Sequence, residues 1–363
     1  KDIIIITIKL YDTTIVITIA MEKFAYDPIA LALAITVLTS ISIFFYVTLF
    51  KSKPSTPTVR EINIYPIKSC SEIQVDTAAV TPRGFLYDRI FQVVSKVDNV
   101  WRYCTPRNKA FEKIFHVKPT FSGKSLKLSS PHGNGTSLSL ELEGAPTSAL
   151  VTTVMGDNET KLEDYGDDVA NWLGEATGID NPRLVGIAHD GKRYVEVNPD
   201  QGEELPSSSP IPLSLADEAP FLLATRESLQ SLNNRLESSG KDAVDMRRFR
   251  PNIVIDGLQP WEEDSLKRIR IGSVEFHAWQ RCGRCTMTTI DRDTLRRGGE
   301  PLSTLGSFRE RENGQRNFGM HLIPVLENDG EGSDGRNISV GDEVEILEYD
   351  EERRAEWERL FGK

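Results

Sequence analysis

The sequence predicts a mixed α/β fold that is mainly β, with a barrel-like core. Short strand-like segments recur between residues 59 and 347, and turn signals such as Pro82-Arg83-Gly84 separate them. Only a few segments have the residue spacing of a helix, so we expect helices as additions to the strands. The length of 363 residues is too great for one ordinary domain and suits two lobes with an appendage.

The appendage is an apolar run near the amino terminus. Residues 28–50 are 23 consecutive positions without a charge, and a helix needs about 20 apolar residues to cross a bilayer. Lys51 and Lys53 follow in a linker over residues 51–57, and this basic flank predicts that the rest of the chain faces the cytosol. A cleaved signal peptide is the alternative, but the run is long for one and no clear cleavage site follows. We predict a single transmembrane anchor.

Residues 1–27 precede this run. The chain begins with Lys1, and residues 1–20 are rich in β-branched residues, with Lys9 and Asp12 between them. Met21 would make a natural start. We hypothesise that residues 1–20 are absent from the native protein, which mass spectrometry of its amino terminus would test.

The first lobe is predicted to cover residues 58–200. Alternating apolar and polar residues indicate a strand over residues 59–65, which Pro66 ends, and a turn follows at residues 67–70. A helix is expected at residues 167–177, where apolar residues keep a spacing of three to four. Further strands are expected at residues 73–80, 89–94, 126–128, 138–142 and 150–154.

The second lobe is predicted to cover residues 201–348. It contains a helix at residues 225–236, and a charged closing helix lies within residues 349–363. Strands are expected at residues 253–255, 269–271, 274–279, 286–290 and 344–347.

Charge and cysteine content exclude several classes of protein. The net charge is −11, so nucleic acid is not an expected partner, because binding to phosphates needs a basic face. Four cysteines are too few for a disulfide scaffold and favour a reducing compartment. With five histidines and one Cys-x-x-Cys, a four-cysteine zinc site would need scattered ligands.

Cys285 is the first candidate for chemistry. It follows Cys282 by three positions and stands near arginines in an otherwise acidic chain, which indicates a soft metal beside an anion. A redox dithiol is not favoured, because the flanking residues are strand-like and no thioredoxin-type pattern follows. From the residues alone, Cys285 could either bind a metal or act as a nucleophile, or it could simply pack as a small buried side chain.

Basic residues form the second set of candidates. Lys68 and Ser69 occupy a turn after a strand, where backbone amides and a hydroxyl can hold a phosphate. Arg89 heads a strand, and Arg250 comes just before Pro251 and Asn252. A guanidinium can bind phosphate or pterin carbonyls with two parallel hydrogen bonds. For each residue alone, a surface ion pair is the alternative.

Two further residues have two interpretations each. Asp217 is a polar site residue or a helix cap, and the cap is slightly favoured. His321 follows Gly319, which permits close backbone approach, and it either lines a site or is an ordinary buried histidine.

Several motifs together resemble the MOSC family, named after the carboxyl-terminal domain of molybdenum cofactor sulfurase, in its two-part form. The resemblance covers residues 58–348, and the motifs occur in the family's order. The first lobe contributes Tyr65-Pro66-Ile67-Lys68-Ser69-Cys70 and Gly84-Phe85-Leu86-Tyr87-Asp88-Arg89. The second contributes Phe249-Arg250-Pro251-Asn252-Ile253-Val254, Cys282-Gly283-Arg284-Cys285 with Thr288, Thr289 and Asp291, then Pro301-Leu302, Phe318-Gly319 and Val340-Gly341-Asp342-Glu343-Val344.

The resemblance implies a molybdenum–molybdopterin cofactor. Cys285 would be both the catalytic residue and the protein ligand of the metal. The pterin and its phosphate would contact Lys68, Ser69, Arg89, Arg250, Asn252, Gly283 and His321. Gly283 and His321 depart from the pattern of the amidoxime-reducing members, in which a hydroxyl residue and an aromatic hydroxyl are expected.

With the predicted anchor, the resemblance favours these amidoxime-reducing members. It implies reduction of N-hydroxylated compounds, such as amidoximes and hydroxylamines, with electrons from NADH through cytochrome b5 reductase and cytochrome b5. The expected location is the mitochondrial outer membrane, with the endoplasmic reticulum or peroxisome as alternatives. The alternative function is a sulfur carrier or cofactor-handling protein, and a scaffold with a degenerate site is a third.

Overall fold

The computed structural model describes residues 3–10, 13–20, 56–142, 150–155, 158–187, 193–195, 210–310, 314–326 and 335–362. The chain divides into two units, residues 1–55 and 56–363. In the first unit, strands β1 (Ile3–Leu10) and β2 (Thr13–Ala20) pair antiparallel. The predicted anchor at residues 28–50 lies outside the described residues. Within the described ranges, no helix has both the length and the apolar content needed to cross a membrane.

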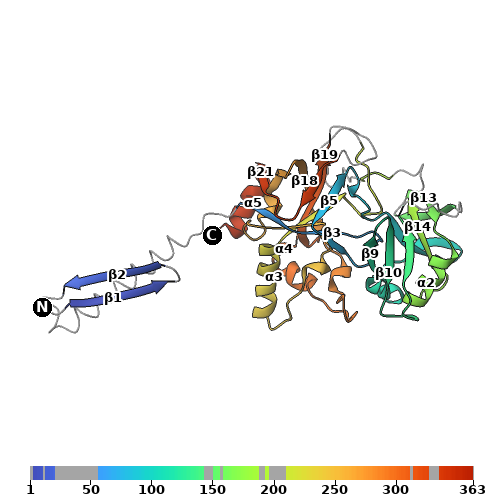
Figure 1. Ribbon diagram of the computed structural model, residues 1–363, viewed down its shortest axis with the longest axis horizontal. Helices are drawn as coiled ribbons and strands as arrows, with labels where there is room; N and C mark the ends of the chain where they lie inside the picture. The colour runs from blue at the N-terminus through green and yellow to red at the C-terminus, as the bar shows by residue number, and fades with distance from the viewer. Residues whose placement is uncertain are drawn as a thin grey trace. The chain divides into compact units, whose positions relative to one another are not determined.

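The second unit is built on one eight-stranded sheet (Figure 1). Strands β15 and β16 are parallel, and the other neighbouring pairs are antiparallel. In spatial order the strands are β21 (Val344–Tyr349), β17 (Leu266–Ile271), β18 (Val274–Gly283), β19 (Asn317–Val325), β15 (Phe221–Thr225), β16 (Ile253–Asp256), β3 (Thr58–Ile64) and β4 (Ile73–Val75).

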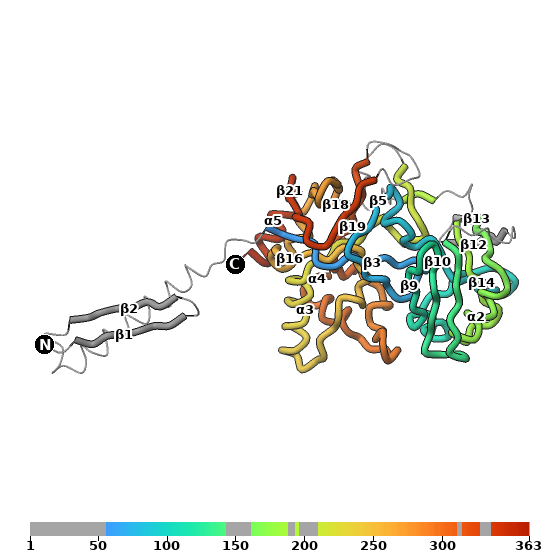
Figure 2. The backbone as a smooth tube through the Cα atoms, viewed as in Figure 1, coloured from blue at the N-terminus to red at the C-terminus, as the bar shows by residue number. Residues whose placement is uncertain are grey.

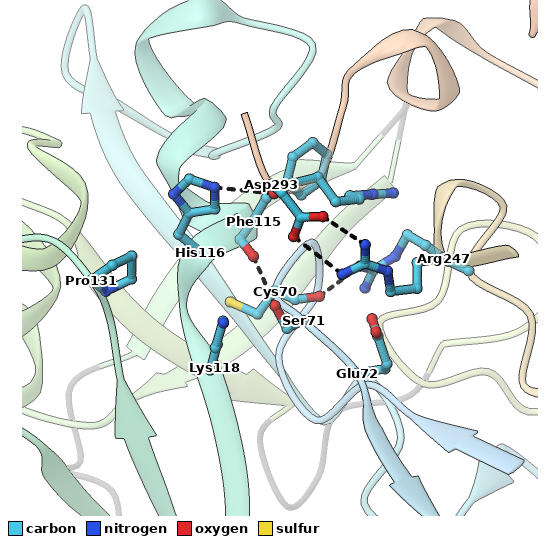
Figure 3. A pocket seen from close by; sticks show the side chains of 11 residues that line it. Cys70, Ser71, Glu72, Phe115, His116, Lys118, Pro131, Arg247 and Asp293 are labelled. Carbon is cyan, nitrogen blue, oxygen red and sulfur yellow. Dashed lines mark hydrogen bonds and ion pairs between the residues drawn. The ribbon is translucent and has the colours of Figure 1, made fainter. Parts of the chain in front are cut away.

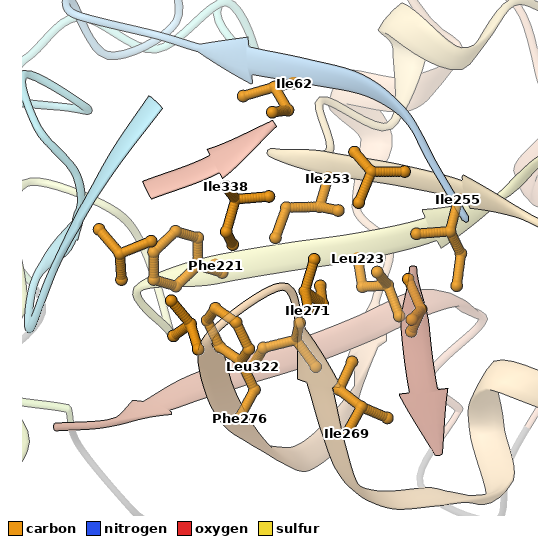
Figure 4. Packing of buried hydrophobic residues seen from close by; sticks show 14 of the residues in the cluster. Ile62, Phe221, Leu223, Ile253, Ile255, Ile269, Ile271, Phe276, Leu322 and Ile338 are labelled. Carbon is orange, nitrogen blue, oxygen red and sulfur yellow. The ribbon is translucent and has the colours of Figure 1, made fainter. Parts of the chain in front are cut away.

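Alternate residues of these strands form the main core (Figure 4). Phe221 and Leu223, Ile253 and Ile255, and Ile269 and Ile271 are spaced by two, so each pair points to the same face of the sheet. Strands β5 (Thr77–Thr81), β6 (Gly84–Phe85) and β20 (Asn337–Ser339) add residues to this core, including Val80, Phe85 and Ile338.

A second group of strands has its own core. A five-stranded sheet has the order β12 (Leu150–Met155), β13 (Asn158–Asp164), β14 (Arg183–Ile187), β7 (Phe91–Val97), β8 (Val100–Tyr103). A three-stranded sheet is made of β11 (Leu138–Glu141), β10 (Ser125–Ser129) and β9 (Lys118–Ser122). Helix α2 (Asp167–Thr177) contributes Val169, Trp172, Leu173 and Ala176 to this core, together with Ile114 of the 3-10 helix η1 (Lys109–His116).

The two groups of strands are interwoven. Strand β3 comes from the first predicted lobe, yet it pairs with β16, with Ile62 opposite Ile253 (Figure 2). Strand β5 pairs with β20, and Thr77 lies opposite Ser339. These two strands are more than 250 residues apart in the chain. The expected lobe boundary at residue 200 lies in a stretch outside the described residues, and it remains a prediction.

The remaining helices pack around the large sheet. Helix α3 (Arg226–Ser238) begins after Thr225, whose hydroxyl accepts a hydrogen bond from the Ser228 amide. Asp350 caps helix α5 (Glu351–Phe361) in the same way. The others are α4 (Leu302–Arg309) and the 3-10 turns η3 (Met246–Arg248), η4 (Glu262–Ser265) and η5 (Thr286–Thr289).

The predicted mainly β character with additional helices is confirmed, but the strand expected at residues 286–290 is wrong. This segment is the 3-10 turn η5. The hydroxyl of Thr288 donates to the Cys285 carbonyl at 2.9 Å, and that of Thr289 donates to the Thr286 carbonyl at 2.8 Å. Threonine hydroxyls that bond nearby carbonyls give the backbone an alternative to strand pairing.

Candidate functional site

A pocket of about 160 Å³ brings residues from both ends of the second unit together. Every site residue predicted from the sequence lines it: Lys68, Ser69, Arg89, Arg250, Asn252, Gly283, Cys285 and His321. These positions span more than 250 residues of sequence. The pairing of β3 with β16 brings Lys68 and Ser69, which follow β3, near Arg250 and Asn252, which precede β16. Arg89 precedes β7, and its amide donates to the Tyr65 carbonyl at 2.8 Å.

The turn after β3 supplies Lys68 and Ser69. The Lys68 amide donates to the Phe91 carbonyl at 2.7 Å, which fixes the turn against β7. The Lys68 side chain is 8% exposed, and its Nζ lies 2.5 Å from Oδ1 of Asp217 and 4.9 Å from the centre of the Tyr103 ring. Burial lowers the pKa of Lys68, and the charge of Asp217 opposes that shift.

Asp217 is therefore an ion-pair partner of Lys68 and not a helix cap. The segment after it leads into strand β15, and the first helix beyond it is α3, which begins at Arg226. The cap interpretation is wrong because Pro220 and the apolar residues that follow continue into the sheet. The side chain of Asp217 remains 62% exposed at the mouth of the pocket.

Two of the arginines lie over the ring of Tyr65. The guanidinium carbons of Arg89 and Arg250 lie 4.3 and 4.2 Å from the centre of its ring. Buried Asp88 holds Arg89 at 2.6 Å through Oδ2, and its Oδ1 accepts a hydrogen bond from the Tyr65 amide at 2.8 Å. Burial raises the pKa of Asp88, while Arg89 opposes this effect.

Three of the predicted residues have a left-handed backbone. The φ angles of Ser69, Arg89 and Arg250 are 69°, 50° and 56°. Such angles are uncommon for residues other than glycine, and they cluster at sites where the surrounding structure enforces them. All three residues line the pocket, so it concentrates several of these uncommon angles.

Asn252 contributes in a different way. Its Nδ2 donates to the Asn63 carbonyl and its Oδ1 accepts from the Leu222 amide, both at 3.2 Å. The side chain is almost fully buried. It therefore links β3 to β15 beside the pocket.

Cys285 lies between strand β18 and the turn η5, and it is half-buried. Two arginines hold this loop. Arg284 donates to the Cys282 sulfur and to the Phe249 carbonyl, both at 2.7 Å. Arg248 pairs with Asp291 at 2.8 Å and donates to the Thr288 carbonyl at 3.3 Å. The Cys285 thiol thus lies at the pocket on a loop that these hydrogen bonds and the ion pair hold in place.

Cys282 has a different environment from Cys285. It is 6% exposed, and burial raises the pKa of its thiol to about 11, although Arg284 opposes the shift. All four cysteines are free. Of the two cysteines in the motif, Cys285 is the accessible one.

Gly283 and His321 complete the predicted set. Gly283 ends β18 opposite Asn317, and a Cβ there would lie 3.1 Å from Cδ of Gln315. His321 lies on β19, opposite Gln280 on one side and Leu222 on the other. Its Nδ1 is 3.7 Å from Oε2 of Glu218.

The pocket also contains residues that sequence reasoning did not assign to it: Arg107, Arg248, Arg284 and Arg292. Arg284 lies inside the motif that carries Cys285, and Arg248 directly precedes the motif that carries Arg250, so both could be found from the sequence. Arg107 and Arg292 lie in segments without any local pattern. Only the packing of η1 and η5 shows where they are.

Known proteins match this chain over nearly all of its second unit. The family model of the MOSC N-terminal beta barrel domain matches residues 56–180, and that of the MOSC domain matches residues 210–345. Mitochondrial amidoxime-reducing component 1 of Homo sapiens is 32% identical over 304 residues, which cover 80% of this chain and 83% of that protein. The Mus musculus protein of the same name is 30% identical over 302 residues, covering 80% and 82%.

Molybdenum cofactor sulfurase of Danio rerio is 30% identical over 286 residues, which cover 75% of this chain and 32% of that protein. The chain thus spans about a third of the length of this longer relative. The two domain models match in order, and a relative that is 32% identical aligns along most of its own length. The chain therefore belongs to the MOSC family.

Proposed function

We propose that this protein is a membrane-anchored, molybdenum cofactor-dependent oxidoreductase that reduces N-hydroxylated compounds. The observation that carries the proposal is the convergence of one accessible thiol, Cys285, with the cations Lys68, Arg89 and Arg250 in one pocket. The names of relatives that cover most of this chain, amidoxime-reducing components, support the reaction class.

The residues of the pocket fit an anionic pterin cofactor. Arg250 is partly buried and donates through Nη1 to the Cys70 carbonyl at 2.6 Å, and in the described part of the chain it forms no ion pair with a carboxylate. Arg89 and Lys68 each have one carboxylate partner. A phosphate would match this excess of positive charge, and guanidinium groups would bind it with paired hydrogen bonds.

In this proposal Lys68, Ser69, Arg89, Arg250 and Asn252 hold the pterin and its phosphate. Gly283 and His321 line the pterin, and Cys285 is the metal ligand and the catalytic residue. The bound cofactor supplies the change of oxidation state that removes an oxygen atom from nitrogen. Arg248 and Arg284 keep the Cys285 loop in place.

The electrons would come from NADH through cytochrome b5 reductase and cytochrome b5. We place the protein in the mitochondrial outer membrane, with the predicted anchor at residues 28–50 and the catalytic unit in the cytosol. The endoplasmic reticulum and the peroxisome are the alternative membranes. Amidoximes and hydroxylamines are the expected substrates.

The test begins with elemental analysis of the full chain, produced in a host that makes molybdopterin. Molybdenum is expected at about one atom per chain, by the one-thiolate ligation proposed here. Reduction of benzamidoxime is then measured with a reconstituted NADH, cytochrome b5 reductase and cytochrome b5 system. The Cys285→Ala variant should fold normally and lose activity, while Cys104→Ala, which alters a thiol outside the pocket, should keep it.

A sulfur-handling function is the second candidate. Cys282 favours it, because its sulfur lies 2.7 Å from Nη1 of Arg284 and three positions from Cys285. A molybdenum-loaded protein that reduces no N-hydroxylated compound, and that carries a persulfide by mass spectrometry, would support this candidate. Molybdenum-free protein from a competent host would exclude the reductase.

A further inference from the structure

A second cavity lies behind the wall of the candidate cofactor pocket. It measures about 140 Å³ and is lined by the turn after β3, the end of η1 and the loops around Arg247 and Asp293 (Figure 3). Arg250 and Arg292 line both spaces. Ser71, His116 and Lys118 line only this second cavity, so we name it the rear cavity.

Arg292 is a buried cation with unused donors. Its side chain is 9% exposed, and its guanidinium carbon lies 3.7 Å from the centre of the Phe115 ring. Within the described part of the chain, Nη2 is its one hydrogen-bonded nitrogen and donates to the Arg248 carbonyl at 3.4 Å. Among the described residues, neither Nε nor Nη1 has a hydrogen-bond partner. A buried charge without a partner is costly, so an anion is needed nearby.

The charge of the neighbouring Arg250 makes an anion beside Arg292 still more favourable. Arg250, which is partly buried, lines the same cavity, and burial together with the Arg250 charge lowers the pKa of Arg292 to about 9. The positive charge of each arginine therefore destabilises that of the other. The ring of Phe115 offers attraction to one face of Arg292 but no negative charge.

The charges that line the rear cavity do not balance. Four cationic side chains, Lys118, Arg247, Arg250 and Arg292, face two carboxylates, Glu72 and Asp293. Asp293 already pairs with Arg247 at 2.8 Å (Figure 3). Within the described ranges Glu72 forms no ion pair with Arg250 or Arg292, although its charge raises the pKa of both. Water could fill the space but would leave the positive charge uncompensated.

We propose that the rear cavity binds a small oxyanion, such as inorganic sulfate or phosphate or a small carboxylate, through the free donors of Arg292. The cavity has room for such an anion, since one water needs only about 10–15 Å³ of the same kind of volume. A guanidinium binds such anions with two parallel hydrogen bonds. Because Arg250 and Arg292 also line the cofactor pocket, the test includes the cofactor-loaded protein.

Calorimetric titration of the full chain with inorganic sulfate, at constant ionic strength in chloride buffer, tests the proposal. One saturable site is expected in the cofactor-loaded protein and also in the Lys68→Met variant, because Lys68 lines only the other pocket. The Arg292→Gln variant should bind sulfate about tenfold to a hundredfold more weakly, the usual effect of losing charge-assisted hydrogen bonds. Arg297→Gln, which alters an arginine paired with Glu112 outside the cavity, should bind normally.

Thermal unfolding gives a second readout. In chloride alone, Arg292→Gln should raise the melting temperature, because it removes an uncompensated buried charge, and sulfate should stabilise the parent protein but not this variant. Repeating the titration with phosphate and with acetate shows whether the cavity prefers a tetrahedral or a planar anion. The proposal is overturned if no saturable binding is seen, or if Lys68→Met abolishes binding while Arg292→Gln retains it.

Discussion

Arg89 and Arg250 lie over the same aromatic ring, with their guanidinium carbons 4.3 and 4.2 Å from the centre of Tyr65. Arg89 also donates through Nη2 to the Arg250 carbonyl at 3.3 Å. These residues are separated by 161 positions in the sequence. Two cations on one ring raise each other's energy unless an anion is bound, so the pair is prepared for a negatively charged ligand.

The first prediction concerns Arg250. Replacing it with alanine should weaken cofactor retention by about 1.5–3 kcal/mol, the usual range for hydrogen bonds to charged groups. Arg250→Lys should recover only part of this loss, because an ammonium keeps the charge but not the planar pair of donors. Molybdenum content after gel filtration measures both. Arg270→Ala, which alters an exposed arginine of β17, is the control, and equal molybdenum content in all four proteins would contradict the assignment.

The second prediction concerns the ion pair of Lys68 and Asp217. A double-mutant cycle with Lys68→Met and Asp217→Asn should give a coupling energy above about 1 kcal/mol, because the ammonium is buried and water screens it poorly. The exposed pair of Lys267 and Glu348, 2.6 Å apart, is the control and should give a smaller coupling energy, because water screens both charges. Urea unfolding provides the free energies. The idea fails if the two cycles give the same coupling energy.

The third prediction concerns Gly319, which lies between the site and the core. Its φ is 85°, and a Cβ there would lie 2.6 Å from the Leu223 carbonyl oxygen. Gly314 has a similar φ of 76°, but no atom lies within 4 Å of its added Cβ. Gly314→Ala should therefore cost only the backbone strain of about 1–2 kcal/mol. Gly319→Ala should cost roughly 1–3 kcal/mol more, from the clash with the neighbouring strand. Equal losses in urea unfolding would show that the contact does not matter.

The fourth prediction concerns pH and Glu263 in η4. Its Oε2 accepts hydrogen bonds from the hydroxyls of Ser228 and Thr225, at 2.8 and 3.3 Å. Burial, and then the charge of Asp264, raises the pKa of Glu263 from 4.5 to about 7. The folded protein therefore holds this proton more tightly than the unfolded chain does. Its contribution to stability is full below about pH 4.5 and is lost as the pH rises to about 7.

Glu263→Gln cannot ionise, so it should be more stable relative to the parent protein at pH 8 than at pH 5. The control Glu345→Gln, which alters an exposed glutamate of β21, should show the same difference from the parent at both values. Unfolding in urea at pH 5, 6, 7 and 8 provides the comparison. A constant difference between Glu263→Gln and the parent across this range would refute the shift.

Local patterns predicted some elements well and others not at all. The apolar spacing of Val169, Trp172, Leu173 and Ala176 gives helix α2 with the predicted bounds, because one face of the helix packs on the sheet. Residues 73–80 were expected as one strand but form β4 and β5, which pair with different strands. The alternation of apolar and polar residues indicates a strand, but it does not show where one strand ends and the next begins to pair with a different neighbour.

The candidate site depends on tertiary contacts, and the sequence pattern alone could not assemble it. Lys68 and Cys285 are far apart in the chain, and the sheet order β3-β16-β15-β19-β18 brings them to one pocket. The family motifs supplied this convergence as an expectation. Arg292 belongs to no motif, and its burial against Phe115 follows from packing alone.

Strand β3 has a practical consequence for work on the carboxyl-terminal half. A fragment that began near residue 210 would keep the cysteine loop but leave β16 with an open edge, where unpaired amides and carbonyls invite association with other molecules. It would also lack β5, the partner of β20. Biochemical study of the accessible thiol therefore requires a polypeptide that starts before residue 58.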